Sequence, residues 1–124
     1  MSTMAPLALV LAALATSPAL AAKVDSSANH FLQRCRAVVD REIDQHFDIG
    51  ICSGVMIAIH DVSILLHVPP DHQLRSCLPE SVTVEQSIAV VVRWLDRRPH
   101  RWDENFMKLA MSALHETWPC NGDQ

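Results

Sequence analysis

The clearest periodic pattern of apolar and polar positions lies between Cys77 and Cys120 and predicts a helix near its start. Thr83 and Gln86 have the spacing of a capping box, in which each side chain satisfies a backbone N–H at the helix start. Apolar residues then recur at steps of three and four, which places them on one helix face. They are Val84, Ile88, Val91, Val92 and Leu95. Pro99 predicts the helix end, because the residue before a proline avoids α-helical geometry.

A second helix is predicted before Cys120, with Asp103 as its N-cap and its end near Trp118. Its apolar stripe consists of Phe106, Leu109, Ala110, Ala113 and Leu114. Each of the two helices has about 14 residues, or roughly 21 Å at the rise of an α-helix. Because the turn between them is short, we expect them to pack antiparallel. Equal lengths would then bring Cys77 beside Cys120.

Two more helices are predicted earlier in the chain. Residues 27–46 carry a stripe at helical spacing, formed by Ala28, Phe31, Leu32, Cys35, Val38, Val39 and Ile43. Gly50 is the expected stop of this helix. Residues 51–66 are apolar around most of a helix circumference, so we expect this helix to be the central and most buried one. Asp61 lies within it and would need a partner if buried.

The segment 67–76 has no periodicity and contains Pro69-Pro70, so it is predicted to be a loop. It carries a compact polar set made of His67, Asp71, His72 and Arg75. Loops held on a rigid scaffold carry function more often than core positions do. The alternative is a solvated connector.

The N-terminus has the pattern of a secretory signal peptide. Leu7 to Ala15 is almost wholly apolar, and Ala19-Leu20-Ala21 has the small-x-small spacing of a cleavage site. The apolar run is shorter than the about 20 residues that span a bilayer. No Lys or Arg precedes it, and the alternative is an N-terminal membrane anchor. We therefore expect residues 1–21 to be a cleaved signal and 22–124 to be one domain in the periplasm.

Charge and cysteine content narrow the class of protein further. The formal net charge of −4 argues against a nucleic-acid partner, which favours a basic face. An export signal together with four cysteines predicts an oxidising compartment and two disulfides. Four cysteines allow three pairings. The antiparallel pair of helices favours Cys77–Cys120, which leaves Cys35–Cys52. The expected fold is all-α, a small bundle of about four helices with two disulfides.

No pattern in the chain indicates catalysis, a cofactor or a metal. The motifs of serine hydrolases, zinc proteases and phosphate-binding loops are missing, and three glycines leave little room for a phosphate cradle. No two of the seven histidines lie three or four positions apart, so no helix presents a pair for a metal. The carboxylates Asp40, Glu42, Asp44 and Asp48 fit a solvated acidic face better than acid–base catalysis. We therefore expect a protein that is not an enzyme.

Three short motifs resemble a known family. They are Cys52-Ser53-Gly54 followed by Asp61, then Cys77-Leu78-Pro79 continuing to Val82-Thr83, and finally Trp118-Pro119-Cys120. This frame is similar to that of the Rap/Tai immunity proteins, which neutralise peptidoglycan amidase effectors delivered by type VI secretion. The resemblance implies an exported, disulfide-bonded helical protein, often a homodimer, that inhibits by occluding the amidase active-site cleft. We expect no nucleic-acid partner and no membrane contact after signal cleavage.

The residues that would contact the effector are our own hypothesis and do not follow from the resemblance. We select Asp71, His72 and Arg75 in the proline-stiffened loop, with Trp102 second as a tryptophan expected to be exposed in a turn. The histidines permit a different function, because they gain charge on mild acidification. The alternative is therefore an acid-responsive periplasmic chaperone.

Overall fold

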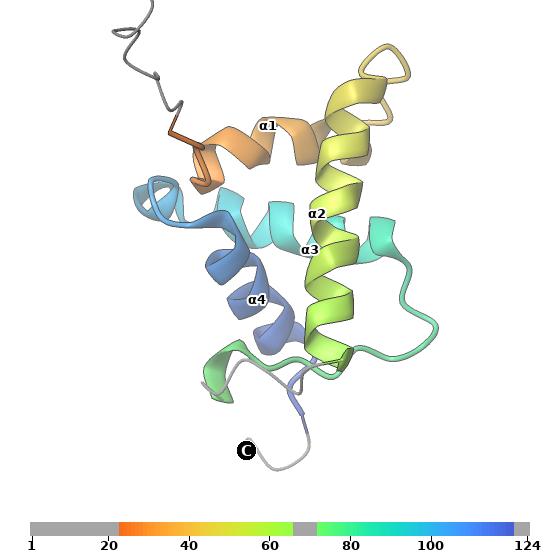
Figure 1. Ribbon diagram of the computed structural model, residues 1–124, viewed down its shortest axis with the longest axis vertical. Helices are drawn as coiled ribbons and strands as arrows, with labels where there is room; N and C mark the ends of the chain where they lie inside the picture. Colours follow the sequence, from red (N-terminus) through yellow and green to blue (C-terminus); the bar gives the residue numbers. More distant parts are fainter. Residues whose placement is uncertain (1–22, 66–71, 121–124) are drawn as a thin grey trace, which may run out of the picture.

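The computed structural model describes residues 23–65 and 72–120, which form an all-α bundle without β-strands, as predicted (Figure 1). The four helices are α1 (Ala28–Val39), α2 (His46–Leu65), α3 (Val84–Asp96) and α4 (Phe106–Thr117). Two short 3-10 helices are η1 (His72–Leu74) and η2 (Pro99–Arg101). The predicted signal segment lies outside the described residues.

Helix α3 packs against all three other helices, as α1 also does, and it is more buried than α2. Its buried positions are Ser87, Ile88, Val91, Val92, Trp94 and Leu95. The expectation that the helix after Gly50 would be central is wrong. Cys52, Met56 and Ile59 of α2 are buried, whereas its outer side exposes Phe47 and Ile57. Helix α2 is apolar on a side that no other part of the described chain covers.

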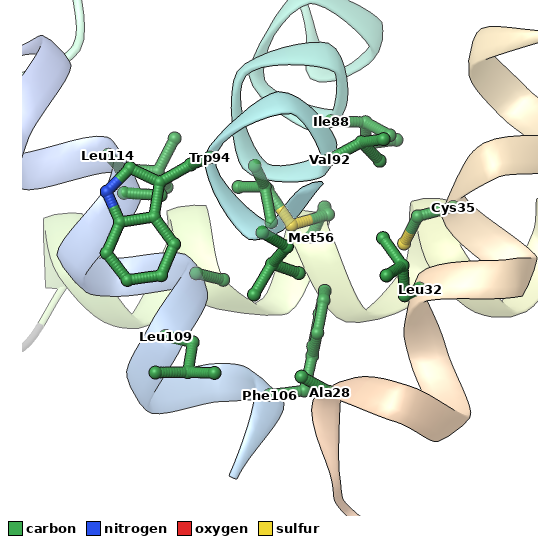
Figure 2. Close-up of a cluster of buried hydrophobic side chains, with 14 of the residues drawn as sticks. Ala28, Leu32, Cys35, Met56, Ile88, Val92, Trp94, Phe106, Leu109 and Leu114 are labelled. Carbon is green, nitrogen blue, oxygen red and sulfur yellow. The ribbon is translucent and has the colours of Figure 1, made fainter. Parts of the chain in front are cut away.

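The core lies where the four helices meet. Figure 2 shows Trp94, Leu109 and Leu114 gathered between α3 and α4, with Phe106 and Ala28 lying together where α4 approaches α1. The ring of Phe106 also stacks on Phe31, with 4.9 Å between centroids. Burial of one such large apolar side chain contributes about 1.5–3 kcal/mol. The predicted apolar stripe of α4 is buried throughout, and that of α3 is buried except for the half-buried Val84.

Helix α1 ends at Val39, earlier than predicted, so the helix 27–46 and its stop at Gly50 are wrong. Arg41 takes the left-handed backbone conformation with φ 54°. Its N–H donates to the Val38 carbonyl at 3.3 Å, and the Glu42 N–H donates to the Ala37 carbonyl at 3.1 Å. These two bonds form a Schellman motif. Glycine usually occupies this left-handed position, so an arginine there gives no signal in the sequence.

The helix starts are only partly as predicted. The capping box of Thr83 and Gln86 is present, with hydrogen bonds of 3.1 and 2.9 Å. The N-cap of α4 is Asn105, whose side chain accepts from Lys108 N at 3.1 Å, and Asp103 is exposed in the preceding loop. The Phe106 N–H donates to the Ser26 carbonyl at 2.8 Å. This contact with the segment before α1 helps to set where α4 begins.

Both predicted disulfides are present. Cys35–Cys52 joins α1 to α2 in the core, with a Cα–Cα distance of 5.1 Å. Cys77–Cys120 joins the segment before α3 to the segment after α4, with a Cα–Cα distance of 4.9 Å. The second disulfide closes the pair of α3 and α4 at its open end.

Candidate partner-binding surface

The segment from η1 to Cys77 is held against α4 at several points. Helix η1 packs on α4. The carbonyl of Arg75 lies 2.5 Å from Nδ1 of His115, and the N–H of Cys77 donates to the carbonyl of Trp118 at 2.8 Å. With the disulfide to Cys120, these contacts fix the backbone of the segment on the bundle. A segment fixed in this way loses little conformational entropy when it binds a partner.

The four predicted contact residues have different places in this structure. Arg75 is half-buried in the fixed segment. His72 begins η1, although its side chain lies outside the described part, as does all of Asp71. Trp102 is half-buried rather than fully exposed, and its Nε1 donates to the Leu95 carbonyl at 2.8 Å. Trp102 therefore has a structural task in addition to any contact with a partner.

A cavity of about 480 Å³ lies between η1, η2 and the facing sides of α3 and α4. Its lining includes Gln73, Leu74, Trp94, Arg101, Lys108 and His115. The sequence analysis missed this cavity. No local spacing in the sequence signals it, because its lining residues come from separate parts of the chain. Trp102 is not among the residues that line the cavity, whereas its neighbour Arg101 is.

Charged groups surround the indole of Trp94 beside this cavity. The guanidinium of Arg98 lies 4.0 Å from the ring centroid, in cation–π geometry. Arg101 lies 5.5 Å from the same centroid and forms two hydrogen bonds to Glu104, of 2.7 and 2.8 Å. These bonds hold the pKa of the Glu104 carboxyl below its usual range and raise the pKa of Arg101. The result is a set of fixed charges suited to recognising a polar protein surface.

A histidine and a serine of the described residues lie in contact, an arrangement that also occurs in catalytic sites. His60 Nε2 lies 3.2 Å from Ser87 Oγ, but Ser87 is fully buried and its hydroxyl donates to the Val84 carbonyl at 2.9 Å. Such a hydroxyl serves helix packing and is inaccessible to a substrate. Asp61 is exposed and so does not need the buried partner considered from the sequence.

Two further features are absent from the described residues. These residues contain no group of three or more His, Cys, Asp or Glu side chains that could hold a metal ion. Among the same residues, no helix is both long enough and apolar enough to cross a membrane.

Of the predicted acidic face, Asp40, Glu42 and Asp44 are exposed, and Asp48 pairs with Arg34 at 3.3 Å.

Comparison with known proteins gives one match. Neither the curated proteins nor the solved structures include a match to this chain. The family model of Rap1a immunity proteins matches residues 27–120, which comprise all four helices and both disulfides. The resemblance found in the cysteine and proline motifs is thereby confirmed, and the chain belongs to the Rap1a immunity protein family.

Proposed function

We propose that this protein neutralises a peptidoglycan amidase effector of type VI secretion by binding it and occluding its active-site cleft. Membership of an immunity family implies an effector protein as the partner. The observation that carries the proposal is the segment from η1 to Cys77, fixed by the His115 contact and by the disulfide to Cys120. A fixed, polar segment of this kind can enter a cleft without first being ordered. The protein itself has no catalytic role in this proposal.

In this proposal Asp71, His72 and Arg75 make the central contacts with the effector, and Trp102 is the second candidate for such a contact. The cavity beside η1, with Arg101 and Lys108 on its lining, would receive polar side chains from the rim of the effector cleft. Contacts of charged groups at an interface contribute mainly to specificity and to the rate of association.

We place the protein in the periplasm after cleavage of residues 1–21. Two disulfides favour an oxidising compartment. The apolar run from Leu7 to Ala15 and the small residues that follow it support export. The amidase substrate, peptidoglycan, lies in the same compartment, so the inhibitor would meet its effector there.

We also propose that the protein is a homodimer formed through the outer face of α2. This glycine face consists of Gly50, Gly54, Ile57 and Ala58, all exposed. A glycine inside a helix is destabilising by roughly 0.5–1 kcal/mol relative to alanine. A Cβ added at Gly50 or Gly54 would meet nothing within 4 Å, so packing within the chain does not require either glycine. Small residues four apart do allow a second helix to approach closely.

A titration of the mature, oxidised protein against a panel of type VI peptidoglycan amidases tests the proposed function. Cleavage of muropeptides is followed at neutral pH. Stoichiometric inhibition of one amidase and not of its relatives is the expected result. If a folded protein with both disulfides inhibits none across a broad panel, the proposal is wrong. Dye binding that appears only near pH 3–5 would then favour the chaperone alternative.

A further inference from the structure

The two disulfides hold different parts of the molecule. Cys35–Cys52 lies in the core, where both cysteines are at most 1% exposed, and it joins α1 to α2. Cys77–Cys120 lies nearer the surface, because Cys77 is exposed and Cys120 is half-buried. It joins the chain before α3 to the chain after α4. The two cross-links therefore act on different parts of the fold.

The exposed disulfide is attached to the segment proposed above to enter the effector cleft. We call this segment, residues 72–77, the contact segment. None of residues 73–77 is fully buried. Every fully buried residue of the described chain lies in one of the four helices, as Figure 2 illustrates for the core. The fully buried part of the core is thus built without the contact segment.

The other contacts that hold the contact segment are non-covalent. Leu74 is half-buried and packs against the core from η1. The Arg75 carbonyl accepts a hydrogen bond from His115, and the Cys77 N–H donates to the Trp118 carbonyl. Contacts at a surface open locally in a native protein, at a lower free energy than global unfolding. The covalent bond from Cys77 limits how far the contact segment moves away from the end of α4 in such an opening.

The exposed disulfide is also open to a reductant. Cys77 lines a cavity of about 580 Å³ between α2, α4 and the residues around Cys77, and the lining includes His60, Leu78 and Leu114. A thiolate of a dithiol attacks Cys77 Sγ, and Cys120 leaves as a thiolate that takes up a proton. The second thiol of the dithiol then displaces Cys77 from the mixed disulfide. The two cysteines thereby gain two electrons and two protons, and the dithiol becomes a disulfide.

We infer that Cys77–Cys120 is a redox switch that controls whether the contact segment is fixed for binding. Reduction of this disulfide frees the segment from α4, while the four-helix core stays folded with Cys35–Cys52 intact. A freed segment must be ordered again in each binding event, and the loss of conformational entropy weakens binding. A chain that still carries both thiols is therefore a weak inhibitor, and oxidation makes it a strong one. The effect on inhibition rests on the proposed function, whereas the release of the segment does not.

Hydrogen exchange of the mature protein tests the release of the contact segment without a partner. Oxidised protein is compared with protein treated with dithiothreitol at a concentration that leaves Cys35–Cys52 intact, as mass spectrometry verifies. Exchange is followed in peptides from the contact segment and from the buried helix α3. The variant Cys77→Ser with Cys120→Ser is the matched control for the reductant, because dithiothreitol should not change its exchange further. Dithiothreitol is then removed and the disulfide is formed again with an oxidised dithiol.

We expect exchange in the contact segment to become at least about 10-fold faster in the reduced protein and in the variant, while α3 keeps its protection. Re-oxidation should restore slow exchange in the unsubstituted protein alone. If the contact segment stays protected after reduction, the switch is wrong. If α3 loses its protection together with the segment, the disulfide supports the whole fold and the switch is equally wrong.

Binding is measured without reductant, so that the amidase itself is unaffected. The double serine variant and the oxidised protein are each titrated with the amidase that the panel identifies. The variant should bind about 10-fold to 100-fold more weakly. Equal affinity in a variant whose contact segment is released would overturn control of binding by this disulfide, although inhibition by the oxidised protein would stand. If the oxidised protein binds no amidase of the panel, the proposed function and its redox control are both overturned, and exchange alone decides whether the disulfide fixes the segment.

Discussion

Trp94 Nε1 donates a hydrogen bond to Glu116 Oε2 at 2.8 Å and so joins α3 to α4 beside the cavity next to η1. The indole is 3% exposed, whereas the Glu116 carboxylate reaches solvent. The same oxygen lies 3.5 Å from Arg98, whose guanidinium covers the indole. The exposed carboxylate of Glu116 therefore accepts a hydrogen bond from the buried indole N–H and also pairs with the guanidinium of Arg98.

The first prediction concerns this hydrogen bond. Glu116→Ala leaves the buried indole N–H without its acceptor, which costs about 1–3 kcal/mol in the free energy of unfolding. Glu116→Gln keeps an acceptor oxygen and should lose less. Urea denaturation of the oxidised protein measures both. Equal losses for the two variants would mean that charge on Glu116, and not its hydrogen bond to Trp94, stabilises the fold.

The second prediction concerns acid stability. Hydrogen bonds from Arg101 lower the pKa of Glu104 in the folded protein below the ordinary value of 4.5. A lowered folded pKa contributes stability that is present above pH 4.5 and lost as the pH falls through the folded pKa. We expect the urea midpoint to fall on acidification below pH 4.5, and Glu104→Gln to reduce that fall.

The matched control for acid stability is Glu80→Gln, which neutralises an exposed carboxylate in the loop before α3. It should leave the acid limb of the stability curve close to that of the unsubstituted protein. An acid limb that Glu104→Gln does not change would contradict the assignment to Arg101 and Glu104.

The third prediction concerns the order in which the disulfides are reduced. Cys35 and Cys52 are at most 1% exposed, whereas Cys77 is exposed and Cys120 half-buried. A thiolate must reach a sulfur atom to attack it, so Cys77–Cys120 should be reduced first. Stepwise dithiothreitol treatment, alkylation and mass spectrometry should find singly reduced protein labelled at Cys77 and Cys120. Labelling at Cys35 and Cys52 in the folded protein would contradict the prediction.

Most of the fold could be predicted because its signals are local. The capping box at Thr83 and Gln86, the apolar stripes of α3 and α4 and the stop at Pro99 each depend on residues within one helix. The disulfide Cys77–Cys120 followed from them, because two equal helices joined by a short turn must bring their open ends together. The early end of α1 could not be predicted in this way, since Arg41 occupies a position at which glycine is the usual signal.

The burial of α2 and the candidate site depend on contacts between distant segments, and the sequence carries little information about those. An apolar pattern around a whole helix does not say which side the neighbours leave open, so the exposure of Ile57 was missed. Arg75 and His115 are 40 positions apart, and their contact arises only because η1 packs on α4. Trp102 was expected in solvent, but its hydrogen bond to the Leu95 carbonyl holds it against the core.

The last prediction separates the proposed homodimer from the stability of the single chain. Gly54→Arg adds a long charged side chain at a position open to solvent within the chain, so each subunit should still fold. On a closely packed helix pair the same side chain would prevent contact, and the mass in solution should fall to that of a monomer. Gln33→Arg, at an exposed position of α1, is the matched control and should remain dimeric. Light scattering across a range of concentrations measures the mass of each protein. A monomeric unsubstituted protein would rule out the homodimer. A dimeric Gly54→Arg variant would mean that the dimer interface lies elsewhere than on the glycine face.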